Sequence, residues 1–126
     1  MRLVLFAILL FATSAFASTK PSFTRDVVPI LKTRCATCHL TGKEAGNLAL
    51  NPAAAYASLV GAKSAVSGLL RVVPGKPDDS YVVMKLEGTH LAKGGKGARM
   101  PFGAGPLPAA QLAMIRSWIK AGATKD

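Results

Sequence analysis

The sequence predicts an all-α domain of about four short helices joined by long loops. Apolar residues recur at helical spacing near both ends of the domain, over residues 22–34 and 108–121. Proline and glycine divide the chain between these two segments, and no stretch is predicted as a strand. The chain has 126 residues, enough for one small domain, and it contains no visible repeat.

Residues 1–17 have the composition of a secretory signal peptide. Arg2 supplies a positive charge, the stretch 3–12 is apolar, and Ala15-Phe16-Ala17 fits the small-x-small cleavage pattern. The alternative is an uncleaved membrane anchor, but the apolar run is short for a span of roughly 20 residues. We therefore expect cleavage, a mature domain over 18–126, a periplasmic or secreted location, and no stable membrane insertion.

The first predicted helix begins at Ser22 or Thr24 and leads directly into Cys35. A hydroxyl at its start can cap free backbone N–H groups, and Asp26 suits the positive end of the helix dipole. Pro29 either lies in the first turn or kinks the helix. The residues expected on its core face are Val27, Ile30 and Leu31.

A second short helix is predicted after Asn51-Pro52, a pair typical of an N-cap followed by proline at the first helical position. The alanine-rich run that follows extends to Leu59, and Gly61 ends it. Regular helix is then excluded over residues 72–77, because Pro74 and Pro77 interrupt it. We expect this segment to be extended and then to turn.

The last two predicted helices cover residues 80–86 and about 108–121. Asp78 or Asp79 is expected to cap the first of them, and Gly88 to stop it. The second has an amphipathic pattern and a glycine C-cap. The residues that define it are Leu112, Ile115 and Ile119 on one face, Trp118 alongside, and Gly122 at its end.

The segment Cys35-Ala36-Thr37-Cys38-His39 matches C-x-x-C-H, the attachment motif of a c-type haem. Two thiols at this spacing can form thioethers with the two vinyl groups of one porphyrin. The histidine that follows is then placed to bind the iron as proximal ligand. The motif predicts one covalent haem c per chain, held by Cys35, Cys38 and His39.

Two other readings of the motif are open at this point. A thioredoxin-like redox pair would require a surrounding βαβ pattern, which the sequence lacks. A zinc site would require a fourth ligand, and outside the motif only His90 is available. The chain has two cysteines, both in the motif, so no structural disulfide is expected elsewhere.

The sixth iron ligand has four candidates: Met84, Met100, Met114 and His90. Met84 and Met114 fall within predicted helices, where methionine more often fills a core. Met100 lies in a long loop before Pro101, at a position from which it can reach the other haem face. We predict Met100 as the ligand and His90 as a solvated loop residue.

The chain resembles the small monohaem class I-type cytochromes c, particularly the short haem domains of bacterial secreted proteins. Besides C-x-x-C-H, the matching pieces are Asp26-Val27-Val28-Pro29-Ile30-Leu31, Leu48-Ala49-Leu50, Pro74-Gly75-Lys76-Pro77 with Ser80, Met100-Pro101, and Trp118-Ile119 with Gly122-Ala123. Two features depart from this pattern. Leu40 replaces a frequent glycine, and the segment 93–97 is rich in glycine, which predicts a flexible approach to Met100.

The resemblance implies a cytochrome c-like fold in which the first and last helices cross. Trp118 would then pack near Val27 or Leu31 as a structural residue rather than an electron relay. A backbone carbonyl around Asn47 or Leu48 would orient the second nitrogen of His39. The candidate partners of the haem propionates are Arg71, Lys76 and Arg99.

The expected function is that of a periplasmic electron carrier with His39 and Met100 as iron ligands, and not that of an enzyme. The alternative is a haem-based gas-binding or sensor protein with a labile sixth ligand. Sixteen basic residues against six acidic ones give a net charge of +10. This charge favours redox partners with acidic docking surfaces or an anionic membrane surface, and the alternative is that it serves solubility alone. Nucleic acid is a poor partner for an exported chain.

Overall fold

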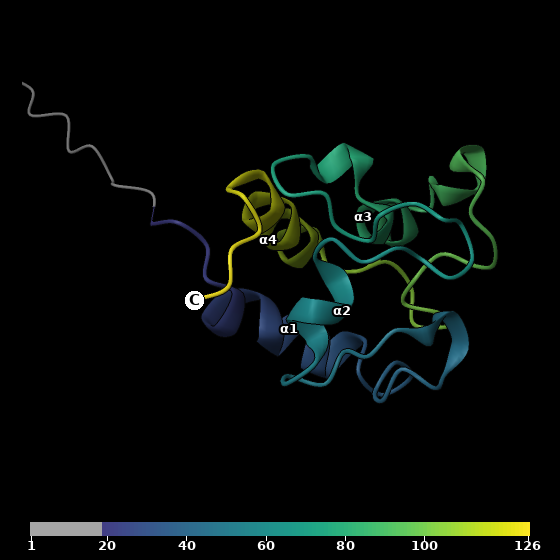
Figure 1. Ribbon diagram of the computed structural model, residues 1–126, viewed down its shortest axis with the longest axis horizontal. Helices are drawn as coiled ribbons and strands as arrows, with labels where there is room; N and C mark the ends of the chain where they lie inside the picture. Colours follow the sequence, from purple (N-terminus) through teal and green to yellow (C-terminus); the bar gives the residue numbers. More distant parts are fainter. Residues whose placement is uncertain (1–18) are drawn as a thin grey trace, which may run out of the picture.

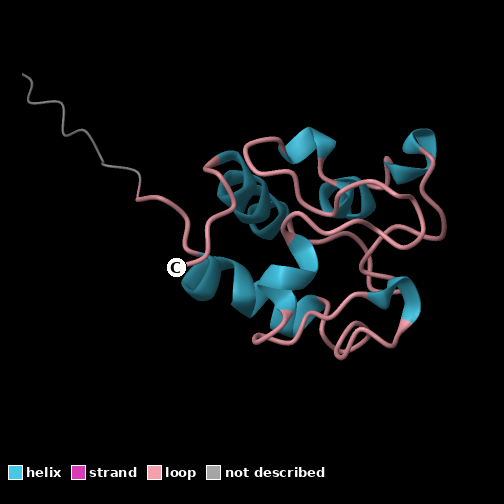
Figure 2. Cartoon of the chain, viewed as in Figure 1, coloured by secondary structure: helices cyan, strands magenta, loops and turns pink. Residues whose placement is uncertain are grey.

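The computed structural model describes residues 19–126, so the signal-peptide prediction for 1–17 lies outside the described residues. This part of the chain is helical, as predicted, with long loops (Figures 1 and 2). The α-helices are α1 Val28–Arg34, α2 Ala55–Leu59, α3 Tyr81–Glu87 and α4 Ala109–Lys120. The shorter helical turns are η1 Phe23–Val27, η2 Ala45–Asn47, η3 Pro77–Asp79 and η4 His90–Lys93.

Strands are absent from residues 19–126, where two isolated β-bridges join Val60 to Val72 and Lys63 to Leu70. Within the same residues, no helix is both long and apolar enough to cross a membrane.

The N-terminal helix begins as predicted, with Ser22 as its cap. The Ser22 hydroxyl accepts a hydrogen bond from the Arg25 amide at 2.9 Å, and the Asp26 carboxylate accepts one from the Ser22 amide at 2.8 Å. Pro29 lies in the first turn of α1, directly after the η1 turn, and so does not break the helix. All three residues predicted for the core face, Val27, Ile30 and Leu31, are buried.

The N-terminal segment packs against α4 through aromatic side chains. The ring of Trp118 lies 5.1 Å from that of Phe23, centroid to centroid, and Tyr56 contacts both. Trp118 therefore packs on Phe23, one turn before Val27, and is buried in the same hydrophobic cluster as the predicted Val27 and Leu31. The C-terminus returns to the same place (Figure 1), where the Asp126 carboxylate accepts a hydrogen bond from the Thr24 amide at 3.0 Å.

Two capping predictions need correction. The Asn51 side-chain oxygen accepts hydrogen bonds from the amides of Ala53 and Ala54, at 3.1 and 3.0 Å, as a cap would. Regular helix, however, starts only at Ala55. Asp78 and Asp79 do not cap α3, because they lie inside the η3 turn and Ser80 takes the N-cap position.

The predicted helix ends are confirmed. Gly88 ends α3 with a φ of 81°, a left-handed conformation that glycine adopts without strain. Gly122 follows α4 with a φ of 109°. The core face of α4 is also as predicted for Ile115 and Ile119, which are buried, whereas Leu112 is half-buried against the core.

Candidate functional site

The C-x-x-C-H segment forms a tight turn at the end of α1. The amides of Cys35 and Ala36 donate to the Leu31 carbonyl at 3.0 and 2.9 Å, which closes the helix. The His39 amide then donates to the Cys35 carbonyl at 3.0 Å. Both cysteines are free thiols; Cys35 is half-buried and Cys38 is exposed.

A cavity of about 300 Å³ opens beside this turn. Cys35 and His39 line it from one segment of the chain, and Met100 lines it from another, some sixty residues later. Its walls are mainly aliphatic, as ligand cavities for large apolar cofactors are. The aliphatic wall residues are Leu48, Leu50, Leu59, Val66, Val82 and Leu86.

His39 has a buried Nδ1 atom with no hydrogen-bond partner. The prediction that a carbonyl near Asn47 or Leu48 would orient it is wrong for this structure. The carbonyls of Gly46 and Asn47 accept hydrogen bonds from the Arg71 guanidinium instead, at 2.8 and 3.1 Å. His39 still lines the apolar cavity, and an imidazole at such a wall can ligate a bound group.

Arg71 is the predicted propionate partner that the structure places at the cavity. Its side chain is buried, and it also donates to the Ser58 carbonyl at 2.8 Å. No carboxylate forms a salt bridge with it among the described residues, and burial lowers its pKa. Lys76 and Arg99 are exposed and do not line the cavity.

Of the four candidates for the sixth ligand, Met100 alone lines the cavity. Met84 is buried in α3, and Met114 packs against the core from α4. The prediction that His90 is a solvated loop residue is wrong: its side chain is 2% exposed. Its Nε2 atom lies 2.8 Å from the Gly97 carbonyl oxygen.

Among the cavity residues that were not anticipated from the sequence are Tyr81 and Lys85 of α3. Tyr81 is buried and its hydroxyl has no hydrogen-bond partner. The only sequence signal for either residue is helical spacing, since Tyr81, Lys85 and the neighbouring Val82 and Leu86 lie on consecutive turns of α3. That spacing does not show which face of α3 borders a cavity.

The state of Cys35 argues against a thiol-redox centre. Burial raises the pKa of its thiol to about 11, whereas reactive cysteines of thioredoxin-like sites have a lowered pKa. The same part of the chain offers no zinc site either. Within residues 19–126, no three His, Cys, Asp or Glu side chains are grouped so that they could hold a metal ion.

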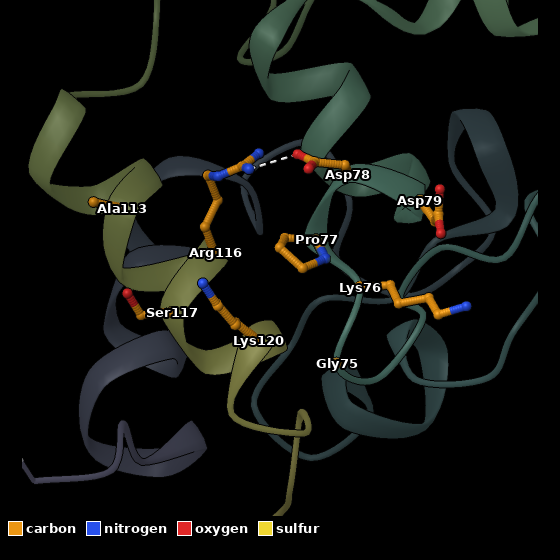
Figure 3. Close-up of a pocket in the computed structure, with 9 residues that line it drawn as sticks. All are labelled: Gly75, Lys76, Pro77, Asp78, Asp79, Ala113, Arg116, Ser117 and Lys120. Carbon is orange, nitrogen blue, oxygen red and sulfur yellow. Dashed lines mark hydrogen bonds and ion pairs between the residues drawn. The ribbon is translucent and has the colours of Figure 1, made fainter.

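A second hollow, of about 720 Å³, lies on the surface between η3 and α4 (Figure 3). Arg116 reaches across it to Asp78 at 2.5 Å and also pairs with Glu87 at 2.8 Å. Lys76 and Asp79 extend away from α4 in this view. The hollow contains none of the predicted site residues except Lys76, and its arginine is already neutralised by two carboxylates.

No family model matches the chain, and no curated protein matches it. Among solved structures, the chain is similar to part of Kuenenia stuttgartiensis hydrazine synthase, with 23% sequence identity and a TM-score of 0.50. The match covers 83% of this chain and 16% of the other. At this identity the likeness concerns the fold alone.

Proposed function

We propose that this chain is a monohaem c-type cytochrome with a cytochrome c-like fold that transfers single electrons between redox partners. One observation carries the proposal. Cys35 and His39 of the C-x-x-C-H turn line the same apolar cavity as Met100. This arrangement combines an attachment motif, a nitrogen donor and a thioether donor around a space suited to an apolar cofactor.

The chain's own residues have distinct roles in this proposal. Cys35 and Cys38 would hold haem c through thioether bonds, and His39 and Met100 would bind its iron. When bound, the haem supplies one-electron redox chemistry. The aliphatic walls exclude water, and the buried charge of Arg71 favours an anionic group on the cofactor. If His39 and Met100 both bound the haem iron, no position on it would be free for a substrate, so we propose no catalytic role.

The proposed setting is the periplasm or the extracellular space, reached through the signal peptide. Removal of Arg2 with the signal peptide leaves fifteen basic and six acidic residues, a net charge of +9. This charge favours partners with acidic docking surfaces, and encounter should slow as salt rises. The activity in the name of the hydrazine synthase is not carried over to this chain, which matches only a small part of that protein.

The test is a pyridine haemochrome spectrum of the protein matured with the c-type haem-attachment machinery. We expect the spectrum of a haem joined by two thioethers. Cys35→Ser and Cys38→Ser should each give the spectrum of a haem joined by one thioether, or lose covalent haem. The matched control is Ser64→Ala, which changes a cavity residue that carries no thiol. Absence of covalent haem from the wild type would refute the proposal.

Carbon monoxide separates the electron carrier from the gas-binding alternative. If Met100 occupies the sixth position, the ferrous protein should bind carbon monoxide slowly and incompletely. Rapid, complete binding by the wild type would favour the gas-binding or sensor function.

A further inference from the structure

The glycine-rich approach to Met100 is fixed to α3 and η4 by two side chains. We propose that Lys85 and His90 are positioning residues that hold the segment 95–100 and thereby keep the Met100 thioether at the cavity. The inference rests on the proposed function, because it concerns how permanently the sixth ligand is bound. It replaces the sequence-based expectation of a flexible approach.

Lys85 holds this segment from α3 with both its side chain and its backbone. Its ammonium group donates to the carbonyls of Lys96 and Ala98, at 2.9 and 2.5 Å. Its own carbonyl accepts a hydrogen bond from the Met100 amide at 2.9 Å. Hydrogen bonds with a charged donor are stronger than neutral ones, so these contacts fix the chain on both sides of Arg99.

His90 binds the Gly97 carbonyl, which lies between the two carbonyls that Lys85 binds. A carbonyl oxygen can only accept, so the His90 Nε2 atom must carry the hydrogen that it donates to Gly97 at 2.8 Å. The His90 backbone carbonyl also accepts a hydrogen bond from the Gly95 amide at 2.9 Å. Three successive carbonyls, those of residues 96–98, therefore face two side chains from neighbouring helical segments.

Gly95 allows the segment to lie this close. A Cβ atom at position 95 would be 2.8 Å from both the His90 carbonyl oxygen and the Tyr81 hydroxyl. Such distances are too short for non-bonded atoms, so only glycine fits without a shift. The glycine here serves close packing on a cavity-lining residue. Gly95 therefore does not indicate a flexible segment.

The two donors offset what a glycine-rich segment loses in conformational entropy when it is ordered. Without them, the free segment would carry Met100 away from the cavity for part of the time. The sixth position would then open to external ligands. Lys85 and His90 thus decide between the electron-carrier behaviour and the gas-binding alternative.

The test compares holoprotein variants by their ferric methionine–iron charge-transfer band and by carbon monoxide binding to the ferrous form. His90→Leu and Lys85→Met each remove donors and keep the apolar volume. We expect a weaker band and about a tenfold faster carbon monoxide association for each lost hydrogen bond. His90→Gln keeps a donor near the Nε2 position and should restore most of the band.

The matched control is Lys93→Met, an exposed lysine of η4 with the same loss of charge, and it should behave as wild type. Amide hydrogen exchange of residues 96–100 in the same holoproteins supplies a second readout, which should quicken in His90→Leu and Lys85→Met only. An unchanged band, association rate and exchange rate in both variants would overturn the positioning role. Failure of the proposed function is seen separately, as a wild type without covalent haem or without the band.

Discussion

Arg71 donates a hydrogen bond to the Gly46 carbonyl at 2.8 Å, across 25 residues of sequence. The same guanidinium reaches the carbonyls of Asn47 and Ser58, so it ties the η2 turn to α2 beside the cavity. A buried cation whose partners include no carboxylate is costly to desolvate. Its position at the cavity wall is explained if the cavity receives an anionic group.

Arg71→Met should lower the free energy of unfolding by about 3 kcal/mol, because it leaves three carbonyls without their charged donor. The measurement is the urea midpoint of the holoprotein. Lys63→Met is the control, since this lysine is exposed and should change stability by less than about 0.5 kcal/mol. Equal midpoints for Arg71→Met and wild type would show that the guanidinium does not hold the η2 turn.

Met100→Ala should abolish the ferric methionine–iron charge-transfer band, because it removes the thioether that lines the cavity. Met84→Ala and Met114→Ala should keep the band, since neither residue lines the cavity. Met84→Ala should still cost about 2–5 kcal/mol of stability through the space it leaves in the core. A band that survives in Met100→Ala would rule out this residue as ligand.

Trp118 should act in stability and not in electron transfer, because it lies in the aromatic cluster with Phe23 and outside the cavity lining. Trp118→Ala should cost about 3–5 kcal/mol in the free energy of unfolding. Trp118→Phe keeps most of the packing but loses the hydrogen bond from Nε1 to the Thr124 carbonyl at 3.0 Å. Both variants should keep the charge-transfer band and the wild-type reduction potential; a large change in potential would contradict this assignment.

The Glu44 carboxylate should stabilise the turn after His39, and this stabilisation should be lost at low pH. Its own amide, the Thr41 hydroxyl, and the amides of Thr41 and Gly42 hold the pKa of its carboxyl at about 2, below the usual 4.5. A lowered pKa means that the unfolded chain takes up the proton first. The contribution of Glu44 to stability is therefore complete above about pH 4.5 and is lost as the pH falls toward about 2.

An NMR titration of the Thr41 and Gly42 amides tests this expectation. Their shifts should follow a pKa near 2, and Glu44→Gln should remove that titration. Asp79→Asn, which changes another exposed carboxylate, should leave it in place. A midpoint near the ordinary value of 4.5 would mean that the carboxylate does not bind these amides in solution.

Features that depend on neighbours in sequence were predictable. The Ser22 cap, the core face of α1 and the glycine ends of α3 and α4 all follow from local spacing and backbone preference. Met100 as the sixth ligand stays a prediction, but its place at the cavity wall agrees with the expectation that a loop methionine, unlike Met84 of α3, is not held in a helix face. Each of these involves contacts within a few residues or the geometry of one element.

The wrong predictions concern polar groups that have more than one possible partner. The carbonyl expected to serve His39 is taken by Arg71, some 24 residues away. Asp78 or Asp79 was expected to cap α3, but both lie in the η3 turn and Ser80 is the N-cap residue. The Ser80 hydroxyl accepts a hydrogen bond from the Val73 amide and donates one to the Lys76 carbonyl. Each of these polar groups has several possible partners, and packing selects among them.

The sequence by itself determined the helical class and led to the hypothesis of a haem held by Cys35, Cys38 and His39, because these depend on residue types at short spacing. Only the tertiary structure decided that His39 and Met100 share one cavity, that Arg71 is buried at its wall, and that Lys85 and His90 hold the glycine-rich segment. These are relationships between distant segments. They depend on how the helices pack, and no local pattern encodes which backbone carbonyl a side chain will meet.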